Sequence, residues 1–220
     1  MKLYGFWRSL ATIRVRVALN LKGIAADEQV SVNLLKGEQH DSAFRKVNPQ
    51  GAVPALVLDD GKPALFQSLA IIEYLDETHP EPPLMPHDAR GRARVRGLSM
   101  IAVADGHPLI VPRVRHYMEH ELKLDEDVRN KWLAYWTGEA LKLMEGHLAG
   151  NPETGRYSHG DSVTMADLCL ASQVIGAQFF KSDTSRVPTV MRIFAECMKL
   201  PAFDAAHPFK QADAPASSAH

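Results

Sequence analysis

The sequence predicts an α/β domain followed by an all-helical domain, and three observations support this prediction. Residues 1–79 follow the element order βαβαββα, residues 79–89 contain four prolines, and every strong pattern after them has helical spacing. Prolines this dense suit neither a helix nor a central strand. We therefore predict domains at 1–79 and 88–208 with a linker at 80–87. The small, polar tail at 209–220 is expected to be disordered.

In the first domain, short apolar strands alternate with amphipathic helices. Gly23 ends the first helix, and the pair Asp60-Gly61 is a strong hairpin signal between the last two strands. Parallel strands followed by an antiparallel hairpin on one small sheet are therefore expected. The expected strands are 2–7, 28–32, 55–58 and 63–66, and the expected helices are 12–22, 40–47 and 67–79.

The second domain contains helical patterns only. The first of its helices is expected to break at Gly106 and Pro108. Thr164 followed by Asp167 forms a capping box, which marks the start of a later helix. The expected helices are 88–118, 125–149, 164–180 and 187–200.

Composition excludes several function classes. The 25 basic residues are balanced by 26 acidic ones, so the excess positive charge that nucleic acids require is absent. No apolar run approaches the roughly 18 residues of a membrane span. Cys169 and Cys197 lie in apolar helical surroundings at a spacing that suits neither a disulfide scaffold nor a zinc site. We expect a cytoplasmic, metal-free protein without a leader, membrane or nucleic-acid partner.

Three short segments carry polar groups at the junctions of strands and helices. Ser9 precedes the first helix, either as its N-cap or as a donor to an anion held at the turn. Val53-Pro54 opens a strand, either as an ordinary turn or as a cis pair that offers the Val53 backbone to an extended peptide. Gln67 and Ser68 open a helix, as a plain start or as a second anion site suited to a carboxylate beside an ammonium.

Several motifs extend this pattern in order along the chain, to about residue 210. They are Trp7-Arg8-Ser9 with Arg14-Val15-Arg16-Val17-Ala18-Leu19, NLLKGEQ at 33–39, NPQGAVPAL at 48–56, QSLAIIEYL at 67–75, DGHPL at 105–109 and GDSVTMADLCL at 160–170. Together they resemble the zeta class of the glutathione transferase family, which includes maleylacetoacetate and maleylpyruvate isomerases. The resemblance implies a thioredoxin-like first domain, an all-helical second domain and a homodimer that binds glutathione and a small electrophilic substrate.

The resemblance also implies roles for individual residues. Ser9 would hydrogen-bond the glutathione sulfur and favour its thiolate, and Arg8 would bind substrate and stabilise enolate charge. Arg113 or Arg115 would hold a substrate carboxylate in place of a family arginine that is missing here, at Phe179. The remaining implied contacts to glutathione are the Val53 backbone at the cysteinyl part, Gln67 and Ser68 at the γ-glutamyl part, Gln39, His40 and Gln50 at the glycine end, and Asp105 and His107 at the cleft and dimer interface.

The implied reaction is addition of the glutathione thiolate to a cis double bond, rotation, and elimination to the trans isomer, as in aromatic catabolism. Glutathione is regenerated and therefore acts as a cofactor. Two departures from the family pattern bear on this. Leu10-Ala11-Thr12-Ile13 replaces a Ser-Cys-Ser-Trp stretch, which removes the family cysteine, and Phe179 stands where many zeta members have an arginine.

Two alternatives remain open at this stage. The first is a glutathione transferase acting on halogenated or other electrophiles, because the same thiolate performs substitution and Phe179 makes the substrate pocket less anionic. The second is a non-catalytic module used for protein association. The intact set of Ser9, Val53-Pro54 and Gln67-Ser68 argues against this second alternative.

Overall fold

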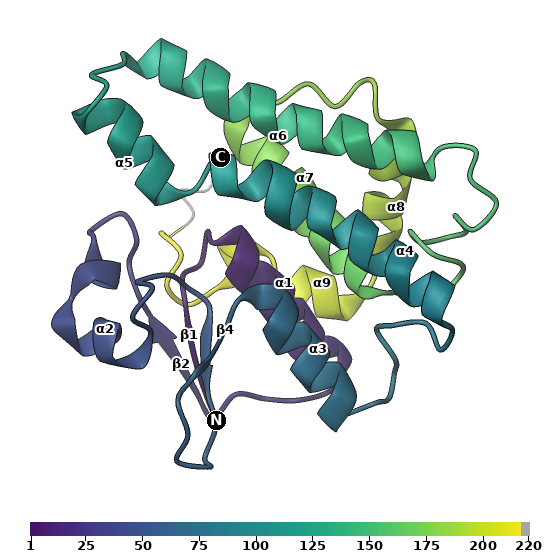
Figure 1. Ribbon diagram of the computed structural model, residues 1–220, viewed down its shortest axis with the longest axis horizontal. Helices are drawn as coiled ribbons and strands as arrows, with labels where there is room; N and C mark the ends of the chain where they lie inside the picture. Colours follow the sequence, from purple (N-terminus) through teal and green to yellow (C-terminus); the bar gives the residue numbers. More distant parts are fainter. Residues whose placement is uncertain (217–220) are drawn as a thin grey trace. The chain divides into compact units, whose positions relative to one another are not determined.

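The computed structural model describes residues 1–216 and divides into two compact units (Figure 1). One unit joins Met1–Pro82 to the C-terminal residues from Leu200 onward, and the other comprises Pro83–Lys199. The division assigns residues 200–208 to the first unit, whereas the sequence placed them in the helical domain. The two units are described in turn.

The first unit is built on a four-stranded sheet whose order is β2-β1-β3-β4. β1 pairs in parallel with β2 and antiparallel with β3, and β3 pairs antiparallel with β4. β4 therefore runs in the same direction as β1. This confirms the predicted parallel pair and hairpin on one sheet. The strands are β1 (Lys2–Gly5), β2 (Glu28–Ser31), β3 (Ala55–Val57) and β4 (Leu65–Phe66).

The register aligns three strand ends at one edge of the sheet. Tyr4 of β1 lies opposite Ala55 of β3, and Ala55 lies opposite Phe66 of β4. The chain leaves β1 and β4 at this edge and enters β3 there, because β1 and β4 run against β3. Segments far apart in the sequence are therefore brought to the same side of the sheet.

Helix α1 is the central helix of the first unit. Every residue from Leu10 to Leu19 is buried, including Arg14 and Arg16. A helix buried on all sides needs cover on all sides, and α1 packs against both α3 and α9 (Figure 1). The helical segments of this unit are α1 (Leu10–Leu21), a 3-10 turn (Glu38–His40), α2 (Ser42–Val47), α3 (Ser68–Thr78), α9 (Pro201–Ala205) and a second 3-10 turn (Pro208–Lys210).

The C-terminal segment differs from the sequence prediction. Residues 209–216, expected to be disordered, have defined positions on the first unit, and residues 217–220 lie outside the described residues. Phe203 is buried on this unit, and the Asn20 side chain of α1 donates a hydrogen bond to the Ala202 carbonyl at 2.9 Å. Within residues 209–216, the Phe209 ring packs on the Trp7 ring with 5.5 Å between ring centroids, so the first unit supplies contacts that a small, polar tail cannot supply by itself.

The second unit is all-helical, as predicted, with α7 at its core. Every residue of α7 from Met165 to Ala177 is buried, and α7 packs against α4, α6 and α8. The predicted break of the first helix is confirmed at residues 101–109. The helical segments are α4 (Ala89–Met100), a π-helical turn (Ile101–Gly106), a 3-10 turn (His107–Leu109), α5 (Pro112–His120), α6 (Glu126–Leu148), α7 (Met165–Phe180) and α8 (Pro188–Met198).

The predicted capping box at the start of α7 is present. Asp167 is fully buried, and its carboxylate accepts hydrogen bonds from the backbone N–H and hydroxyl of Thr164, at 2.7 and 3.0 Å. It also accepts one from the Ser158 N–H at 2.7 Å. Burial raises the pKa of the Asp167 carboxyl, and the hydrogen bonds from Ser158 and Thr164 oppose that rise. One carboxylate therefore joins a loop to the central helix.

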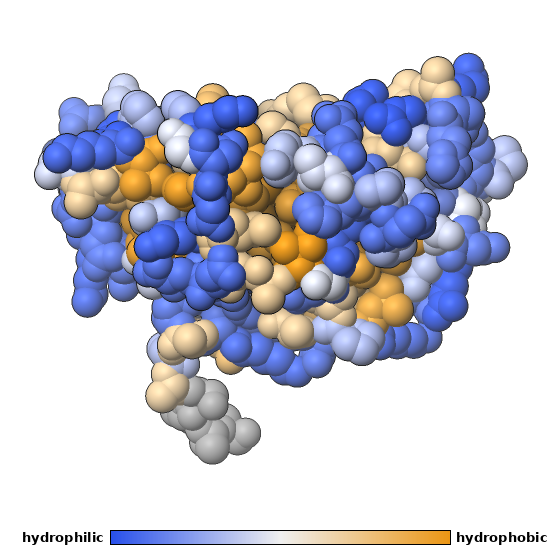
Figure 2. Space-filling view, turned by 90° about the horizontal axis from the view of Figure 1, so that it is seen from below, coloured by the Kyte–Doolittle hydropathy of each residue, from blue (hydrophilic) through white to orange (hydrophobic). Residues whose placement is uncertain are grey.

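The face seen in Figure 2 is hydrophilic around its margins, with hydrophobic residues exposed among hydrophilic ones towards its middle. None of the helices within residues 1–216 has the length and apolarity needed to cross a membrane. Across the same residues, no group of three or more His, Cys, Asp or Glu side chains could hold a metal ion. Cys169 and Cys197 are buried and are not joined in a disulfide, and burial raises the pKa of the Cys197 thiol. Such thiols are poor nucleophiles.

Candidate functional site

Ser9 begins α1 with a side chain that can both accept and donate. Its backbone is extended, and its Oγ accepts a hydrogen bond from the Thr12 N–H at 3.2 Å, so Ser9 is the N-cap. A serine hydroxyl that accepts one hydrogen bond retains its proton for another partner. The first turn of α1 contains no acidic residue to offset the positive end of the helix dipole. Capping and anion binding are therefore compatible at Ser9.

The Val53-Pro54 peptide bond is cis, one of the two arrangements considered for this pair, and its proposed role toward an extended peptide stays a prediction. Val53 directly precedes β3, and among residues 1–216 neither its N–H nor its C=O takes part in a backbone hydrogen bond. A backbone amide and carbonyl without partners beside a sheet edge can pair with an extended peptide.

Gln67 and Ser68 begin α3 at the same edge of the sheet. Gln67 has a φ of 68° and a ψ of 121°, which an L-residue rarely adopts, and α3 has no side-chain cap. The Gln67 Nε2 donates to Gln50 Oε1 at 3.1 Å, which brings two predicted site residues together. Ser68 is buried, and its Oγ accepts from Arg14 Nη1 at 3.2 Å. Arg14 stands in a motif noted in the sequence but was given no role there, although a charged residue among aliphatic ones was a signal.

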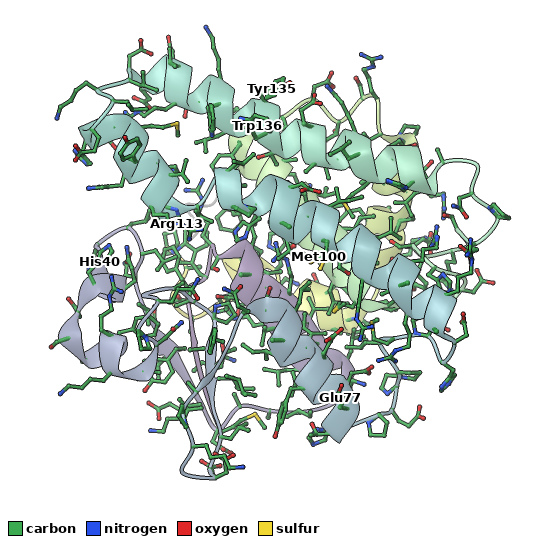
Figure 3. All side chains as sticks on the ribbon, viewed as in Figure 1. His40, Glu77, Met100, Arg113, Tyr135 and Trp136 are labelled. Carbon is green, nitrogen blue, oxygen red and sulfur yellow. The ribbon has the colours of Figure 1, made fainter. Side chains whose placement is uncertain are left out.

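Gln39 and His40 form a second polar group with Arg45, which sequence reasoning missed. Gln39 Nε2 lies 3.2 Å from His40 Nε2, and Arg45 Nη2 lies 3.3 Å from His40 Nδ1. His40 is labelled in Figure 3 near α2. Gln39 Oε1 is buried without a hydrogen-bond partner among the described residues. A buried acceptor without a partner is costly unless a ligand satisfies it.

Gly51 allows this second group to pack closely. Its φ is +62°, and a Cβ there would lie 2.9 Å from the Gln39 carbonyl oxygen and 2.8 Å from Arg45 Cζ. Only glycine combines that backbone conformation with that space. The turn after Asn48 therefore depends on Gly51 to bring Gln50 beside Gln67.

Asp105, His107 and Arg113 belong to the second unit. Asp105 is exposed in the π-helical turn, His107 is half-buried at the start of the following 3-10 turn, and Arg113 is exposed in the first turn of α5 (Figure 3). Arg115 lies over the Phe180 ring at 6.0 Å, and its burial lowers the pKa of its guanidinium. The group at the sheet edge includes none of these residues, and their roles stay predictions.

The polar groups at the sheet edge fit one kind of ligand. They comprise a hydroxyl donor at one helix start, a backbone pair before β3 and a second helix start with an amide side chain, and the second polar group adds a buried amide oxygen that has no hydrogen-bond partner within residues 1–216. Such a set suits an extended peptide with one charged end near α3 and a reactive group near Ser9. The hydroxyl, backbone and amide groups of this set are suited to hydrogen-bonding a peptide ligand.

Comparisons with known proteins bear on the family of the chain. The family model for the glutathione S-transferase N-terminal domain matches residues 3–83. A maleylpyruvate isomerase of a Ralstonia species is 44% identical over 213 residues, which cover 97% of this chain and 99% of that protein. The structure of a maleylacetoacetate isomerase of Methylobacterium extorquens AM1 with bound malonate and GSH has a TM-score of 0.95 at 47% identity, covering 98% of this chain and 100% of that one.

A second solved structure is equally similar. It is a maleylpyruvate isomerase described as a bacterial glutathione S-transferase of the zeta class, in its holo form. Its TM-score is 0.93 at 43% identity, and the match covers 98% of this chain and 100% of that one. The similarity therefore extends over both units of the chain.

Proposed function

Because the chain belongs to the zeta class of the glutathione S-transferase family, we propose that it converts a cis, maleyl-type dicarboxylate to its trans isomer with glutathione as cofactor. The protein is an enzyme, and its relatives include isomerases of maleylpyruvate and of maleylacetoacetate. The non-catalytic alternative finds no support in these relatives. The substrate would be one of these two compounds, in aromatic amino-acid or aromatic-compound catabolism.

One observation carries the assignment of the site. The strand register sets the Ser9 loop, Val53 and Gln67 along one edge of the sheet, although they lie far apart in the sequence. Glutathione is an extended tripeptide, and the groups at this edge match its parts. The partner-free backbone of Val53 suits its central residue, and the uncapped start of α3 suits its γ-glutamyl carboxylate.

The remaining binding residues would fix the two ends of the tripeptide. Gln67 and Ser68 would hold the γ-glutamyl end, where the hydrogen bond from Arg14 orients the Ser68 hydroxyl. Gln39, His40 and Gln50 would serve the glycine end. The buried Gln39 Oε1, which has no partner among residues 1–216, would gain one in the complex.

Bound glutathione supplies a thiol sulfur whose reversible addition to the cis double bond permits rotation to the trans isomer. Ser9 would donate its hydroxyl proton to that sulfur, and the N-terminus of α1 would favour negative charge there. Arg8 would hold a substrate carboxylate and stabilise enolate charge. Asp105 and His107 would bind glutathione, and Arg113 would bind a substrate carboxylate. We further propose that the protein is cytoplasmic and forms a homodimer. Sedimentation of the pure protein would test the dimer.

Phe179 favours a second candidate function, transfer of glutathione to halogenated or other electrophiles. It is half-buried in the last turn of α7, at a position where many zeta members carry an arginine. Without that cation the pocket would hold a dicarboxylate less strongly, whereas an electrophile with one carboxylate or none would lose less.

An assay with three substrates separates the two functions. Maleylacetoacetate, maleylpyruvate and a chlorinated acid would each be supplied with and without glutathione. We expect turnover of at least one maleyl compound, only with glutathione and without net glutathione consumption, because the cofactor is regenerated. Turnover of the chlorinated acid alone, with consumption of glutathione, would reject the isomerase in favour of the transferase.

Replacing Gln67 by glycine is expected to stabilise the fold and weaken glutathione binding. Glycine adopts a φ of 68° without strain, so the free energy of unfolding should rise by about 1 kcal/mol. Loss of the amide hydrogen bonds should weaken glutathione affinity about tenfold. Urea denaturation and titration calorimetry measure the two effects. Gln67→Ala is the matched control.

The alanine variant separates the two effects because it loses the amide but keeps a Cβ. It should bind glutathione as weakly as Gln67→Gly without the gain in stability. If the two variants were equally stable, the backbone of Gln67 would not be strained. If both bound glutathione with wild-type affinity, the Gln67 side chain would have no role in binding.

A further inference from the structure

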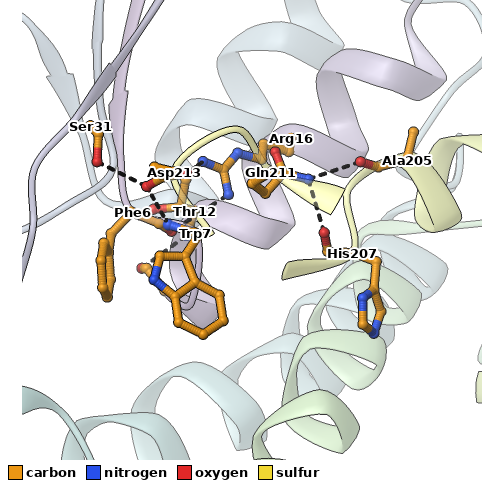
Figure 4. Close-up of polar contacts among 10 residues, drawn as sticks. Phe6, Trp7, Thr12, Arg16, Ser31, Ala205, His207, Gln211 and Asp213 are labelled. Carbon is orange, nitrogen blue, oxygen red and sulfur yellow. Dashed lines mark hydrogen bonds and ion pairs between the residues drawn. The ribbon is translucent and has the colours of Figure 1, made fainter. Parts of the chain in front are cut away.

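We propose that Asp213, near the C-terminus, is a positioning residue that holds the Ser9 loop in its reactive geometry. Its carboxylate accepts a hydrogen bond from the Trp7 backbone N–H at 2.9 Å and another from the Ser31 hydroxyl at 2.9 Å (Figure 4). Trp7 lies two residues before Ser9. One side chain therefore ties the end of β2 to the loop that leads into α1.

Arg16 adds a third contact from α1. Its Nη2 lies 3.9 Å from the Asp213 carboxylate, and its Nη1 donates to the Phe6 carbonyl at 3.5 Å. The same carbonyl accepts the Ser9 N–H at 3.0 Å. Phe6 and Trp7 are thus held on both sides of the peptide that joins them, by Arg16 on the carbonyl and by Asp213 on the N–H.

These contacts are shielded from water. Arg16 is 6% exposed and the Asp213 side chain 19% exposed, so their hydrogen bonds and charges are screened less than those at the surface. Burial lowers the pKa of Arg16, and the negative charge of Asp213 counteracts that effect. Among the described residues, Arg16 Nε has no hydrogen-bond partner, which leaves Asp213 as the anion that faces this guanidinium.

The path of the C-terminal segment is itself fixed by local contacts. Gln211 Nε2 donates to the carbonyls of Ala205 and His207, at 2.9 and 3.0 Å (Figure 4). The Phe209 ring packs on the Trp7 indole with 5.5 Å between ring centroids. These contacts order the C-terminal segment. The hydrogen bond between Trp7 and the Asp213 carboxylate therefore costs little conformational entropy.

The contacts of Trp7 affect catalysis because Trp7 lies only two residues before Ser9 in the chain. The Ser9 hydroxyl acts on a thiol only in a narrow range of positions, because hydrogen bonds weaken steeply with distance and angle. A loop released at Trp7 would move the start of α1 relative to Val53 and Gln67. This inference rests on the proposed function, since it concerns the same thiol site.

The test compares Asp213→Ala, Asp213→Asn and Asp204→Ala. Asp204 is the matched control because it is an exposed acid of the same segment, paired only with Lys210 in the hydrogen bonds and ion pairs found for it. We expect Asp213→Ala to lower kcat/KM about tenfold and to raise the thiol pKa of bound glutathione by about one unit. Asp213→Asn should stay within about twofold, because an amide oxygen still accepts from Trp7 and Ser31.

Two further measurements separate positioning from general stability and from the proposed function itself. Amide hydrogen exchange at Trp7 should accelerate in Asp213→Ala while exchange in β1 stays unchanged. A Ser9→Ala variant is measured in parallel. If Ser9→Ala is impaired while Asp213→Ala matches Asp204→Ala in rate and thiol pKa, the role of Asp213 is refuted and the thiol site stands. Equal losses in Asp213→Asn and Asp213→Ala would also overturn the proposal, since charge alone would then account for the effect.

Discussion

Ser9→Ala should lower kcat/KM about 30-fold at neutral pH and raise the thiol pKa of bound glutathione by about 1.5 units. The variant loses a hydrogen bond to a charged partner, which contributes about 2 kcal/mol, and one pKa unit corresponds to about 1.4 kcal/mol. Because a raised pKa leaves less thiolate near pH 7, the deficit should shrink as the pH rises above the new pKa. The absorbance of the thiolate and the pH dependence of kcat/KM measure the shift.

Matched variants separate the chemical role of Ser9 from its role as N-cap. Alanine at an N-cap costs about 1 kcal/mol of stability, whereas glycine costs only a few tenths. Ser9→Gly should therefore lose activity as Ser9→Ala does while unfolding at nearly the wild-type urea concentration. Ser9→Thr keeps a hydroxyl and should keep most of the activity. A wild-type thiol pKa in Ser9→Gly would rule out the sulfur contact.

Asp167→Ala is expected to cause the largest loss of stability, about 4 kcal/mol. The substitution leaves two buried N–H groups and one hydroxyl, on Ser158 and Thr164, without their acceptor. Against an ordinary free energy of unfolding of about 5–15 kcal/mol, this loss amounts to about a quarter to four-fifths. Urea denaturation followed by circular dichroism measures the loss.

Asp161→Ala is the matched control for this prediction. Asp161 also accepts a backbone hydrogen bond, from the Arg156 N–H at 2.8 Å, but that contact is exposed and water can replace it. Its loss should be below about 0.5 kcal/mol. Equal stability of the two variants would mean that the buried carboxylate of Asp167 contributes no more than a surface turn does.

The fold was predictable from the sequence because its signals are local. The Asp60-Gly61 turn, the glycine after the first helix and the capping box each lie within a few residues of the structure that they specify. Ser9, Val53 and Gln67 could be found in the same way, since each stands at the junction of a strand and a helix or turn.

The missed residues act over long distances in the chain. Arg14 reaches Ser68 across 54 positions, and Asp213 reaches Trp7 across 206. No periodicity or turn chemistry encodes such a pairing, because it exists only after the sheet and α1 have formed. The tail was expected to be disordered for the same reason, as its composition says nothing about the surface that it would meet.

The first unit is made from both ends of the chain, and this has a consequence for its biosynthesis. As the chain leaves the ribosome, residues 1–82 emerge long before α9 and Asp213, and domains form as their parts become available. The sheet and α1 would therefore lack their contacts with the last segment until the whole second unit has been synthesised. The loop before α1 would thus gain these contacts only after the second unit has been synthesised, so a nascent chain that lacks Asp213 would carry the proposed thiol site without the contacts that we propose set its geometry.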